Sequence, residues 1–311
     1  MAVNPSFDLT VGVPVYNGAR YLREALDSVL AQDFPGVRVV ISDNCSDDGT
    51  EAIAKEFAAS HAGITYLRQS ENLGAIRNFE AVLQACETEF FAWIGDHDRW
   101  SPNYASTLVA ALRSHPHAVL AYPEVSRISM LGEVIEARCS ADRWSALEED
   151  ALSRFRTLIW RRKSAVMIYG VARAAALKAI KLPRTLGPDN ILLAELVLRG
   201  GFCFVPDTTF YYRELREAET PEEMWMRQRA ELAVKGTGTP WWHVFAEIVK
   251  VIVRSSRLSP GKKLRAIDET IWAFQMRWSQ TLRSENARWA ACLAFANRVL
   301  ARFRGTRVPS W

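Results

Sequence analysis

The chain has 311 residues, of which 49% are hydrophobic and 24% charged, with a formal net charge of +4. This composition is typical of a soluble globular protein and excludes an intrinsically disordered chain, because the apolar fraction suffices for a large core. The five cysteines form no Cys-x-x-Cys pair and no Cys/His cluster with zinc spacing. With no N-terminal signal pattern and no apolar run of the roughly 18–20 residues that span a bilayer, a cytoplasmic protein is expected.

The first 125 residues alternate short apolar runs with helical patterns. Strands are predicted at 9–15, 37–42, 64–69 and 90–95, and helices at 21–32, after the polar cluster 43–49, and at 74–86. Such alternation indicates right-handed βαβ units and a mostly parallel sheet with helices on both faces. Ligands of such sheets bind at the carboxyl ends of the strands. Polar side chains lie at three of these ends, at Tyr16-Asn17, Asp43-Asn44 and Asp96-Asp98.

The pattern continues less regularly to residue 220 and then changes. Helices are predicted at 102–114, 147–160 and 188–199, strands at 118–125 and 165–172, and a strand pair around 202–213. From Pro221 onward only helices are expected, with two apolar stripes. The stripes consist of Trp241, Trp242, Phe245, Ile248, Val249 and Ile252, and of Ile267, Ile271, Phe274 and Trp278.

Two carboxylates follow the fourth predicted strand, Asp96 and Asp98, with His97 between them. Carboxylates two residues apart can reach one divalent cation, which prefers oxygen ligands and bridges carboxylate to phosphate. Such a cation acts as a Lewis acid on a departing diphosphate. A simple polar turn is the alternative, since this triplet is common, but the position at a strand end favours a metal site. His97 either contacts the metal or phosphate or faces solvent.

Three further sites carry candidate chemistry. Asp43 ends the second strand, where a carboxylate accepts hydrogen bonds from a base or ribose; the alternative is a helix N-cap. In the segment of Asn72 and Gly74, the glycine permits a tight turn, and Arg77 either reaches a phosphate or pairs with an acidic neighbour. Asp189 precedes a helical pattern, where it is either an N-cap or a general base for an attacking hydroxyl.

Together these segments resemble the inverting glycosyltransferases of family 2, which have a GT-A fold, over roughly residues 9–215. The segments are VGVPVYNGARYLREALDSVLAQ, VVISDNCSDDGT, NLGAIRNF, WIGDHDRW and, in the acceptor half, YGVARAAAL, GPDNILLAEL and YYR. The resemblance implies a Rossmann-like catalytic domain at 1–220, with a nucleotide-binding half (1–125) and an acceptor half (126–220). It also implies a nucleotide-sugar donor, with a UDP-sugar favoured and dTDP- or GDP-sugars open.

Residue roles follow from the same resemblance. Pro14, Tyr16 and Asn17 would lie on the nucleotide side, Asp43 at the base and Arg77 near the nucleotide. Asp96 would lie near the ribose and Asp98 would coordinate Mn²⁺ or Mg²⁺. Asp189 matches the position of the base, although the family often has two adjacent acidic residues where this chain has Pro188-Asp189. The implied reaction is a single displacement with inversion onto the hydroxyl of a glycan, a lipid-linked saccharide or a small molecule.

The remaining segment, 221–311, is predicted to be a basic, Trp-rich helical subdomain. Residues 222–311 hold 16 Lys+Arg and 7 Asp+Glu, a balance of +9, whereas the rest of the chain holds 23 and 28, a balance of −5. Its Trp, Arg and Lys side chains suit either peripheral contact with a membrane or packing on the catalytic core with formation of a homo-oligomer, which we favour. No nucleic-acid partner is expected, because no recognised module accompanies the charge.

Two alternative functions remain from the sequence. One is a nucleotide-sugar-binding relative without catalysis, against which Asp96, Asp98 and Asp189 argue. The other is a sugar nucleotidyltransferase, which would normally carry a Gly-rich, cationic phosphate loop after the first strand. The segment 13–18, VPVYNG, lacks that character.

Overall fold

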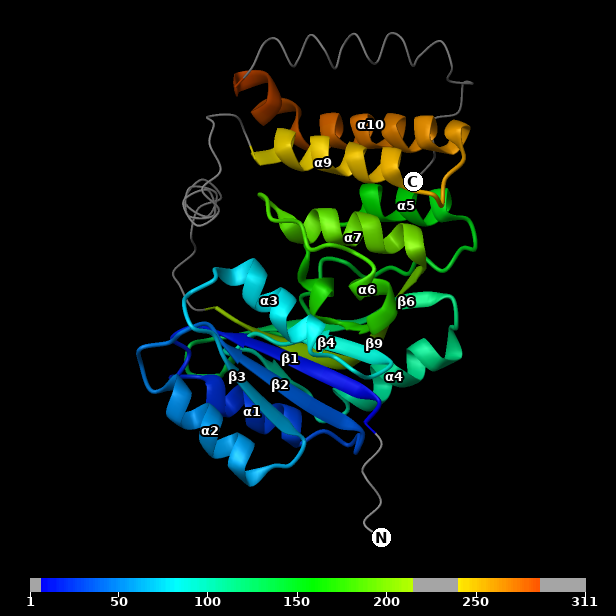
Figure 1. Cartoon of the computed structure of the whole chain (residues 1–311). Coiled ribbons are helices and arrows are strands. Elements are labelled where there is room, and N and C mark those ends of the chain that lie inside the picture. Colours follow the sequence, from blue (N-terminus) through cyan, green and yellow to red (C-terminus); the bar gives the residue numbers. More distant parts are fainter. Residues whose placement is uncertain (1–6, 215–239, 286–311) are drawn as a thin grey trace.

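A curled mixed sheet forms the centre of the computed structural model, which describes residues 7–214 and 240–285 (Figure 1). Within these residues the strand order is β3-β2-β1-β4-β8-β6-β9-β5, and β7 pairs with β6 at one side. The first half of the sheet is parallel, as predicted. The second half is not, because β8 runs antiparallel to both β4 and β6, and β5 runs antiparallel to β9.

The parallel half brings the polar strand ends together. Its strands are β1 (Leu9–Val15), β2 (Val37–Asp43), β3 (Ile64–Arg68) and β4 (Phe90–Trp93). Val15 lies opposite Asp43, and Gly12 lies opposite Trp93, so β1, β2 and β4 end at the same edge of the sheet. β1 is buried along its whole length, as expected for an apolar strand covered on both faces.

Helices cover both faces of the sheet and enclose two apolar cores. On one face lie α1 (Leu22–Leu30), α2 (Thr50–Ser60) and α4 (Tyr104–Ser114), which pack on Val11, Val13 and Ile41. The other face is covered by α3 (Ala75–Gln84), α5 (Ala151–Arg161), α6 (Ala174–Lys178) and α7 (Pro188–Arg199).

The second part of the sheet differs in detail from its prediction. The strand expected at 165–172 is a 3₁₀ turn (Val166–Tyr169) followed by a short β8 (Val171–Arg173). Between them Gly170 lies so close to the sheet that a Cβ would come within 2.3 Å of the Ala121 carbonyl oxygen. The pair expected around 202–213 is one strand, β9 (Gly201–Arg213), which runs parallel to β6 (Ala118–Ile128) with a register shift at Pro123/Glu124. The remaining strands are β5 (Arg99–Trp100) and β7 (Val134–Glu136).

Two long helices follow, α9 (Pro240–Arg254) and α10 (Pro260–Glu285), stacked above α5 and α7 in Figure 1. Ile248 and Ile252 of the first predicted stripe and Ile271 and Phe274 of the second are buried, so these positions pack on protein. The Trp278 side chain and residues 215–239 and 286–311 lie outside the described part of the chain. No helix in the described ranges is both long and apolar enough to cross a bilayer.

Candidate functional site at the carboxyl ends of the strands

The loops after β1 and β2 are joined by hydrogen bonds that begin at Asn17. This residue has a positive φ of 53°, which an asparagine tolerates better than most side chains. Its amide donates to Ser46 Oγ (2.9 Å), and its Oδ1 accepts from the Asp47 amide (3.0 Å). The neighbouring Tyr16 is 49% exposed, whereas Pro14 is buried in β1. Tyr16 therefore presents an exposed aromatic ring at this edge of the sheet, whereas Pro14 is buried inside the sheet.

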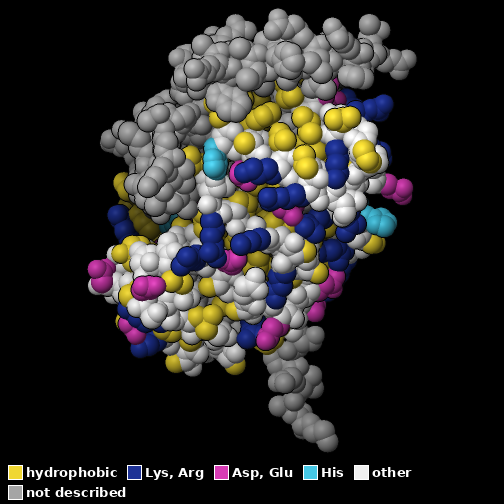
Figure 2. Space-filling model, turned by 45° about the horizontal axis from the view of Figure 1, so that its top comes forward, with side chains coloured by type: hydrophobic (Ala, Val, Ile, Leu, Met, Phe, Trp, Pro, Cys, Tyr) yellow, Lys and Arg dark blue, Asp and Glu magenta, His cyan; other side chains and the backbone are white. Residues whose placement is uncertain are grey.

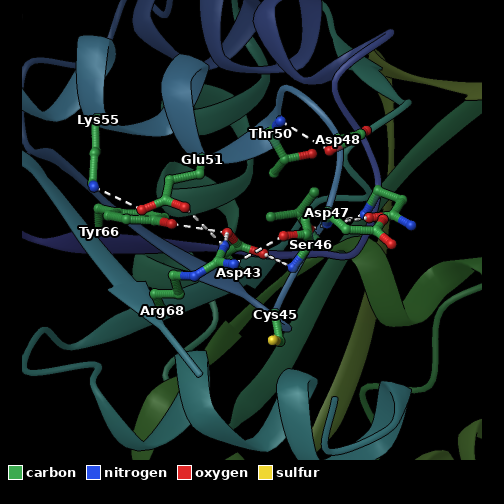
Figure 3. Close-up of polar contacts among 12 residues, drawn as sticks. Asp43, Cys45, Ser46, Asp47, Asp48, Thr50, Glu51, Lys55, Tyr66 and Arg68 are labelled. Carbon is green, nitrogen blue, oxygen red and sulfur yellow. Dashed lines mark hydrogen bonds and ion pairs between the residues drawn. The ribbon is translucent and has the colours of Figure 1, made fainter. Parts of the chain in front are cut away.

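Asp43 lies at the centre of a buried polar network, drawn in Figure 3. Its Oδ1 accepts from the Ser46 amide (2.8 Å), and its Oδ2 accepts from Tyr66 Oη (2.8 Å) and Arg68 Nη1 (2.6 Å). Burial raises the pKa of Asp43, but the hydrogen bonds from Ser46 and Tyr66 and the charge of Arg68 outweigh it and lower the pKa. Both carboxylate oxygens are thus engaged with protein. The observed role of Asp43 is to hold the 44–50 loop, and Tyr66 and Arg68 stand between it and solvent.

Asn72 and Gly74 lie in a third loop tied to the second. Asn72 Oδ1 accepts from Asn44 Nδ2 (2.8 Å) and from the Gly74 amide (2.9 Å). Gly74 adopts a φ of 80°, so the tight turn that the sequence predicted here does require glycine. Arg77, in the first turn of α3, is exposed, and its side chain makes no hydrogen bond or ion pair to any described residue. No described acidic residue pairs with Arg77, and its place near a phosphate stays a prediction.

Asp96 packs over the glycine of the first loop. A Cβ on Gly18 would lie 1.9 Å from Asp96 Oδ2, so only glycine leaves room for this carboxylate. Asp96 Oδ1 contacts His97 Nδ1 at 2.9 Å. Burial lowers the pKa of His97, but Asp96 and Asp98 outweigh it and raise the pKa. His97 is thus held between two carboxylates and is not simply a solvent-facing loop residue.

Asp98 is buried, with an exposed fraction of 1%. Its Oδ1 accepts from the Arg213 amide (2.9 Å), while its Oδ2 is buried with no hydrogen-bond partner among the described residues. Burial raises the pKa of Asp98 to about 6, against the opposing effects of His97 and the Arg213 amide. A buried carboxylate oxygen without a donor is costly unless a cation or proton satisfies it. This oxygen is the feature of the site that fits a metal ligand best.

Arg213, at the end of β9, holds the loop of Asp98 in place and was not predicted. Its buried guanidinium donates to the carbonyl of His97 (2.7 Å), to the carbonyls of Ser129 and Met130, and to Glu24 Oε2 (2.6 Å). It also stacks over the ring of Tyr21, 4.6 Å from its centroid. Arg213 ends the YYR segment that the family resemblance included, but neither the resemblance nor the spacing assigned it a role.

Asp189 occupies the second position of α7, after Gly187, which has a positive φ of 60°. Its side chain is accessible to solvent, yet the surrounding protein desolvates it and raises its pKa to about 6, against the charge of Arg162. No hydrogen bond joins it to a described backbone amide, so the N-cap alternative is not what the structure contains. A carboxylate that is accessible, ionised near neutral pH and free of a capping bond is suited to accept a proton.

Tyr169 links this carboxylate to the Asp96-Asp98 loop. Burial raises the pKa of Tyr169 well above its usual value, and Asp98, Asp189, Tyr212 and Asp96 raise it further. The pKa of this one side chain is thus raised by three of the four predicted acidic residues, Asp96, Asp98 and Asp189. Arg162, another residue that the sequence did not single out, has its pKa lowered to about 10 by burial and the neighbouring Arg277, with Asp142 and Asp189 acting in the opposite sense.

The protein residues do not form a complete metal cage by themselves. Among the described residues no group of three or more His, Cys, Asp or Glu side chains is arranged to hold an ion. Mg²⁺ and similar ions are commonly held by one or two carboxylates together with substrate phosphates and water. Asp98 with its unpartnered Oδ2, and Asp96 beside it, fit that kind of open site.

Relatives of known sequence match only part of this chain. An uncharacterized glycosyltransferase of Rickettsia prowazekii is 34% identical over 95 residues, which are 30% of this chain and 29% of the relative. The glycosyltransferase GlyA of Streptococcus pneumoniae is 32% identical over 100 residues, 32% of this chain and 14% of that protein. The matched region therefore spans less than a third of either relative's length.

The fold extends the likeness over more of the chain. The crystal structure of S. aureus TarS 1–349 in complex with UDP-GlcNAc superposes with a TM-score of 0.63 at 20% identity, covering 87% of this chain and 73% of that one. At this identity the likeness concerns the fold, which is GT-A-like. The family model of glycosyl transferase family 2 matches residues 10–176, which are more than half of the chain and include the four loops after β1, β2, β3 and β4 but not Asp189. By that match, the chain belongs to glycosyl transferase family 2.

Proposed function

We propose that the protein transfers a sugar from a nucleoside-diphosphate sugar to a hydroxyl acceptor in a single displacement with inversion. The observation that carries this proposal is the buried carboxylate of Asp98, whose Oδ2 has no hydrogen-bond partner among the described residues, at the strand ends of a chain that matches glycosyl transferase family 2. A proton acceptor on one side and the diphosphate-side carboxylates on the other are the two requirements of such a displacement.

The donor would bind along the loops after β1, β2 and β3. Tyr16 offers an exposed ring for a base or ribose, and Arg77 offers to a phosphate an exposed guanidinium that pairs with no described residue. Asp43 would act by fixing the loop that faces the base, with Tyr66 and Arg68 as the groups nearest to it. Because the fold neighbour TarS was crystallised with UDP-GlcNAc and with UDP, UDP-sugars are the first donors to test, before dTDP- and GDP-sugars.

A divalent cation, Mn²⁺ or Mg²⁺, would be held by Asp98 with support from Asp96. Oδ2 of Asp98 has no hydrogen-bond partner among the described residues, which supports this assignment. A negative charge buried without a partner is energetically costly, and a bound cation would offset that cost. When bound, such an ion neutralises charge on the departing diphosphate. The chain's own contribution is to fix the carboxylate, through the amide of Arg213, and to align the loop through its guanidinium.

Asp189 would act as the base. As the acceptor oxygen attacks the anomeric carbon, its proton passes to the Asp189 carboxylate, and the bond to the diphosphate breaks on the opposite face. Attack opposite the leaving group inverts the configuration at that carbon. Alignment of the acceptor and stabilisation of developing charge supply most of the acceleration in this type of reaction.

The test separates binding from transfer. We expect Asp189→Asn to retain binding of UDP in the presence of Mn²⁺, measured by calorimetry, while transfer from the matched sugar donor falls at least about 100-fold. Transfer within a few-fold of the unmodified protein would refute Asp189 as the base. Loss of UDP binding in the same variant would show that the residue serves the donor instead.

The donor class is identified by a thermal-shift panel of UDP-, dTDP- and GDP-sugars with Mn²⁺. The preferred donor should raise the melting temperature in proportion to ln(1 + [L]/Kd). Slow metal-dependent release of the sugar from that donor, without an acceptor, would exclude a non-catalytic binding protein. Formation of a sugar nucleotide from a nucleoside triphosphate and a sugar phosphate would point instead to a nucleotidyltransferase.

A further inference from the structure

A cavity separate from the strand ends lies between α7, α9 and the loops that precede and follow them. Its volume is about 510 Å³. It is lined by the 181–184 loop, by one side of α7 from Ile191 to Arg199, by the last two turns of α9 and by residues 255–257. Asp189, two positions before Ile191, is not part of its lining, and neither is any residue of the 96–98 loop.

The lining is strongly cationic. It contains six cationic and two acidic side chains; the six are Lys181, Arg184, Arg199, Lys250, Arg254 and Arg257, and the two are Glu195 and Glu247. Both acidic groups are already paired within their helices, Glu195 with Arg199 and Glu247 with Lys250. The excess of positive charge is therefore not balanced inside the cavity.

Three of the cations have no partner among the described residues. The side chains of Lys181, Arg254 and Arg257 are exposed and make no hydrogen bond or ion pair to any described residue. Arg254 lies in the last turn of α9, where a cation also interacts favourably with the helix dipole. Lys181 and Arg257 lie in loops, so the dipole does not explain them. Figure 2 shows Lys and Arg side chains gathered across this side of the molecule, with few acidic ones among them.

The chemistry of the lining selects the ligand. Arginine presents a planar fork of donors that matches phosphate oxygens, and lysine adds a mobile point charge. Below the charged rim lie apolar side chains, Leu182, Ile191 and Leu198, which are buried, and Val251, which is partly buried. A cavity of this size accommodates a phosphate or diphosphate together with the first part of an apolar chain.

We propose that this cavity is a second anion site, which binds a phosphate-bearing ligand through Lys181, Arg254 and Arg257. The apolar part of that ligand packs on Leu182 and Val251. The site is independent of the donor site and of the identity of the donor. The phosphate comes either from the headgroup of an anionic lipid or from a soluble phosphate ester.

The test uses the full-length chain and inorganic pyrophosphate as the probe. Calorimetric titration is done in EDTA without UDP, so that the metal-dependent strand-end site contributes little and no other diphosphate competes for the cavity. We expect pyrophosphate to bind, and the double variant Arg254→Ala/Arg257→Ala to bind it at least about ten-fold more weakly, because two charge-assisted contacts are lost. The matched control is Arg265→Ala, an exposed arginine of α10 outside the cavity lining, which should bind as the unmodified chain does.

A vesicle arm distinguishes the two sources. Phosphatidylcholine vesicles with and without phosphatidic acid are sedimented with the unmodified chain and the double variant. If the unmodified chain binds only the vesicles with phosphatidic acid and the double variant binds neither kind, the ligand is a lipid headgroup. If the double variant loses pyrophosphate binding but the unmodified chain binds neither kind of vesicle, the ligand is a soluble phosphate ester. Pyrophosphate binding that is absent, or equal in the double variant, would overturn the proposal. UDP binding with Mn²⁺ should stay unchanged in the double variant, which separates this outcome from failure of the donor site.

Discussion

Replacing Arg213 with methionine tests whether one buried arginine holds the acidic loop. Methionine has a similar length but no donor, so the carbonyl of His97 and the carboxylate of Glu24 lose their charged partner. Removing one member of a buried ion pair costs about 3–5 kcal/mol, because the remaining groups stay uncompensated. Glu24 is 38% exposed and recovers some hydration, so we expect the lower end, about 3 kcal/mol.

Urea unfolding gives the free energy, and Arg127→Met is the matched control. Arg127 lies on β6, 45% exposed, and pairs with Glu136 and Glu214 at the surface. Exposed pairs contribute about 0–1 kcal/mol, so the control should differ little from the unmodified chain. Equal destabilisation of the two variants would show that Arg213 contributes no more than a surface ion pair.

A second measurement separates stability from positioning. The amide of residue 213 still reaches Asp98 in the variant, because that contact is made by the backbone. The guanidinium contact to the His97 carbonyl is lost, so the loop gains freedom on the side that faces Asp96. Under conditions where the Arg213→Met protein is fully folded, we expect UDP with Mn²⁺ to bind about ten-fold more weakly or worse. Unchanged binding would restrict Arg213 to a structural role.

Three further predictions concern the same edge of the sheet. Gly18→Ala should displace the Asp96 carboxylate and weaken UDP binding, measured by calorimetry. The control is Gly49→Ala, which should not weaken it, because its Cβ would meet its nearest atom at 3.5 Å. Equal effects of the two variants would contradict the packing of Asp96 on Gly18. Asp98→Asn should raise stability in EDTA by up to about 3 kcal/mol at pH 8, because a folded-state pKa of about 6 in place of 3.8 disfavours the ionised form. Since that penalty disappears as the pH falls through 6 towards 3.8, urea unfolding of the two proteins should converge near pH 4. Transfer should rise with pH through about 6 as Asp189 loses its proton, and a flat rate between pH 5 and 7 would exclude it as the titrating base.

The parallel half of the fold was predictable because its signals are local. Each of the strands β1 to β4 is a short apolar run, and each following helix carries an apolar face, so periodicity alone gave their type and order. Gly74 at a positive φ likewise follows from its neighbours. The position of Asp96 and Asp98 at a strand end required only that β4 be parallel to β1, which it is.

The second half of the sheet was less predictable because its pairing is long-range. β8 is three residues long, and its direction is set by its neighbours β4 and β6 in space, not by any pattern in its own sequence. The single long β9 looked like two strands because its centre, Val205 to Thr209, contains Pro206 and Asp207, where the pairing with β6 shifts register. Sequence periodicity does not reveal such a shift.

The candidate site, too, could be predicted only in part from the sequence. Every acidic residue that the sequence selected lies at the strand ends or at the start of α7, but the residues that orient them come from elsewhere. Asp98 is fixed by Arg213, 115 positions away, and Asp98 and Asp189 each raise the pKa of the buried Tyr169 in the 3₁₀ turn. No spacing rule relates these positions, since they meet only when β9 and the 3₁₀ turn fold against the first half.

Arg213 both positions the acidic loop and affects the ionisation of Asp98. The acidic loop is held to β9 by Arg213, whose guanidinium donates to the His97 carbonyl and pairs with Glu24 of α1. This guanidinium therefore joins β9 to α1, and its charge also opposes the burial that raises the pKa of Asp98. A cation at Asp98 and the cation at Arg213 stabilise the same ionised carboxylate, one from the open side and one from within the fold. Loss of Arg213 should therefore make the ionisation of Asp98 depend more strongly on bound metal, so that the stabilising effect of Mn²⁺ with UDP shifts to higher pH in Arg213→Met than in the unmodified chain.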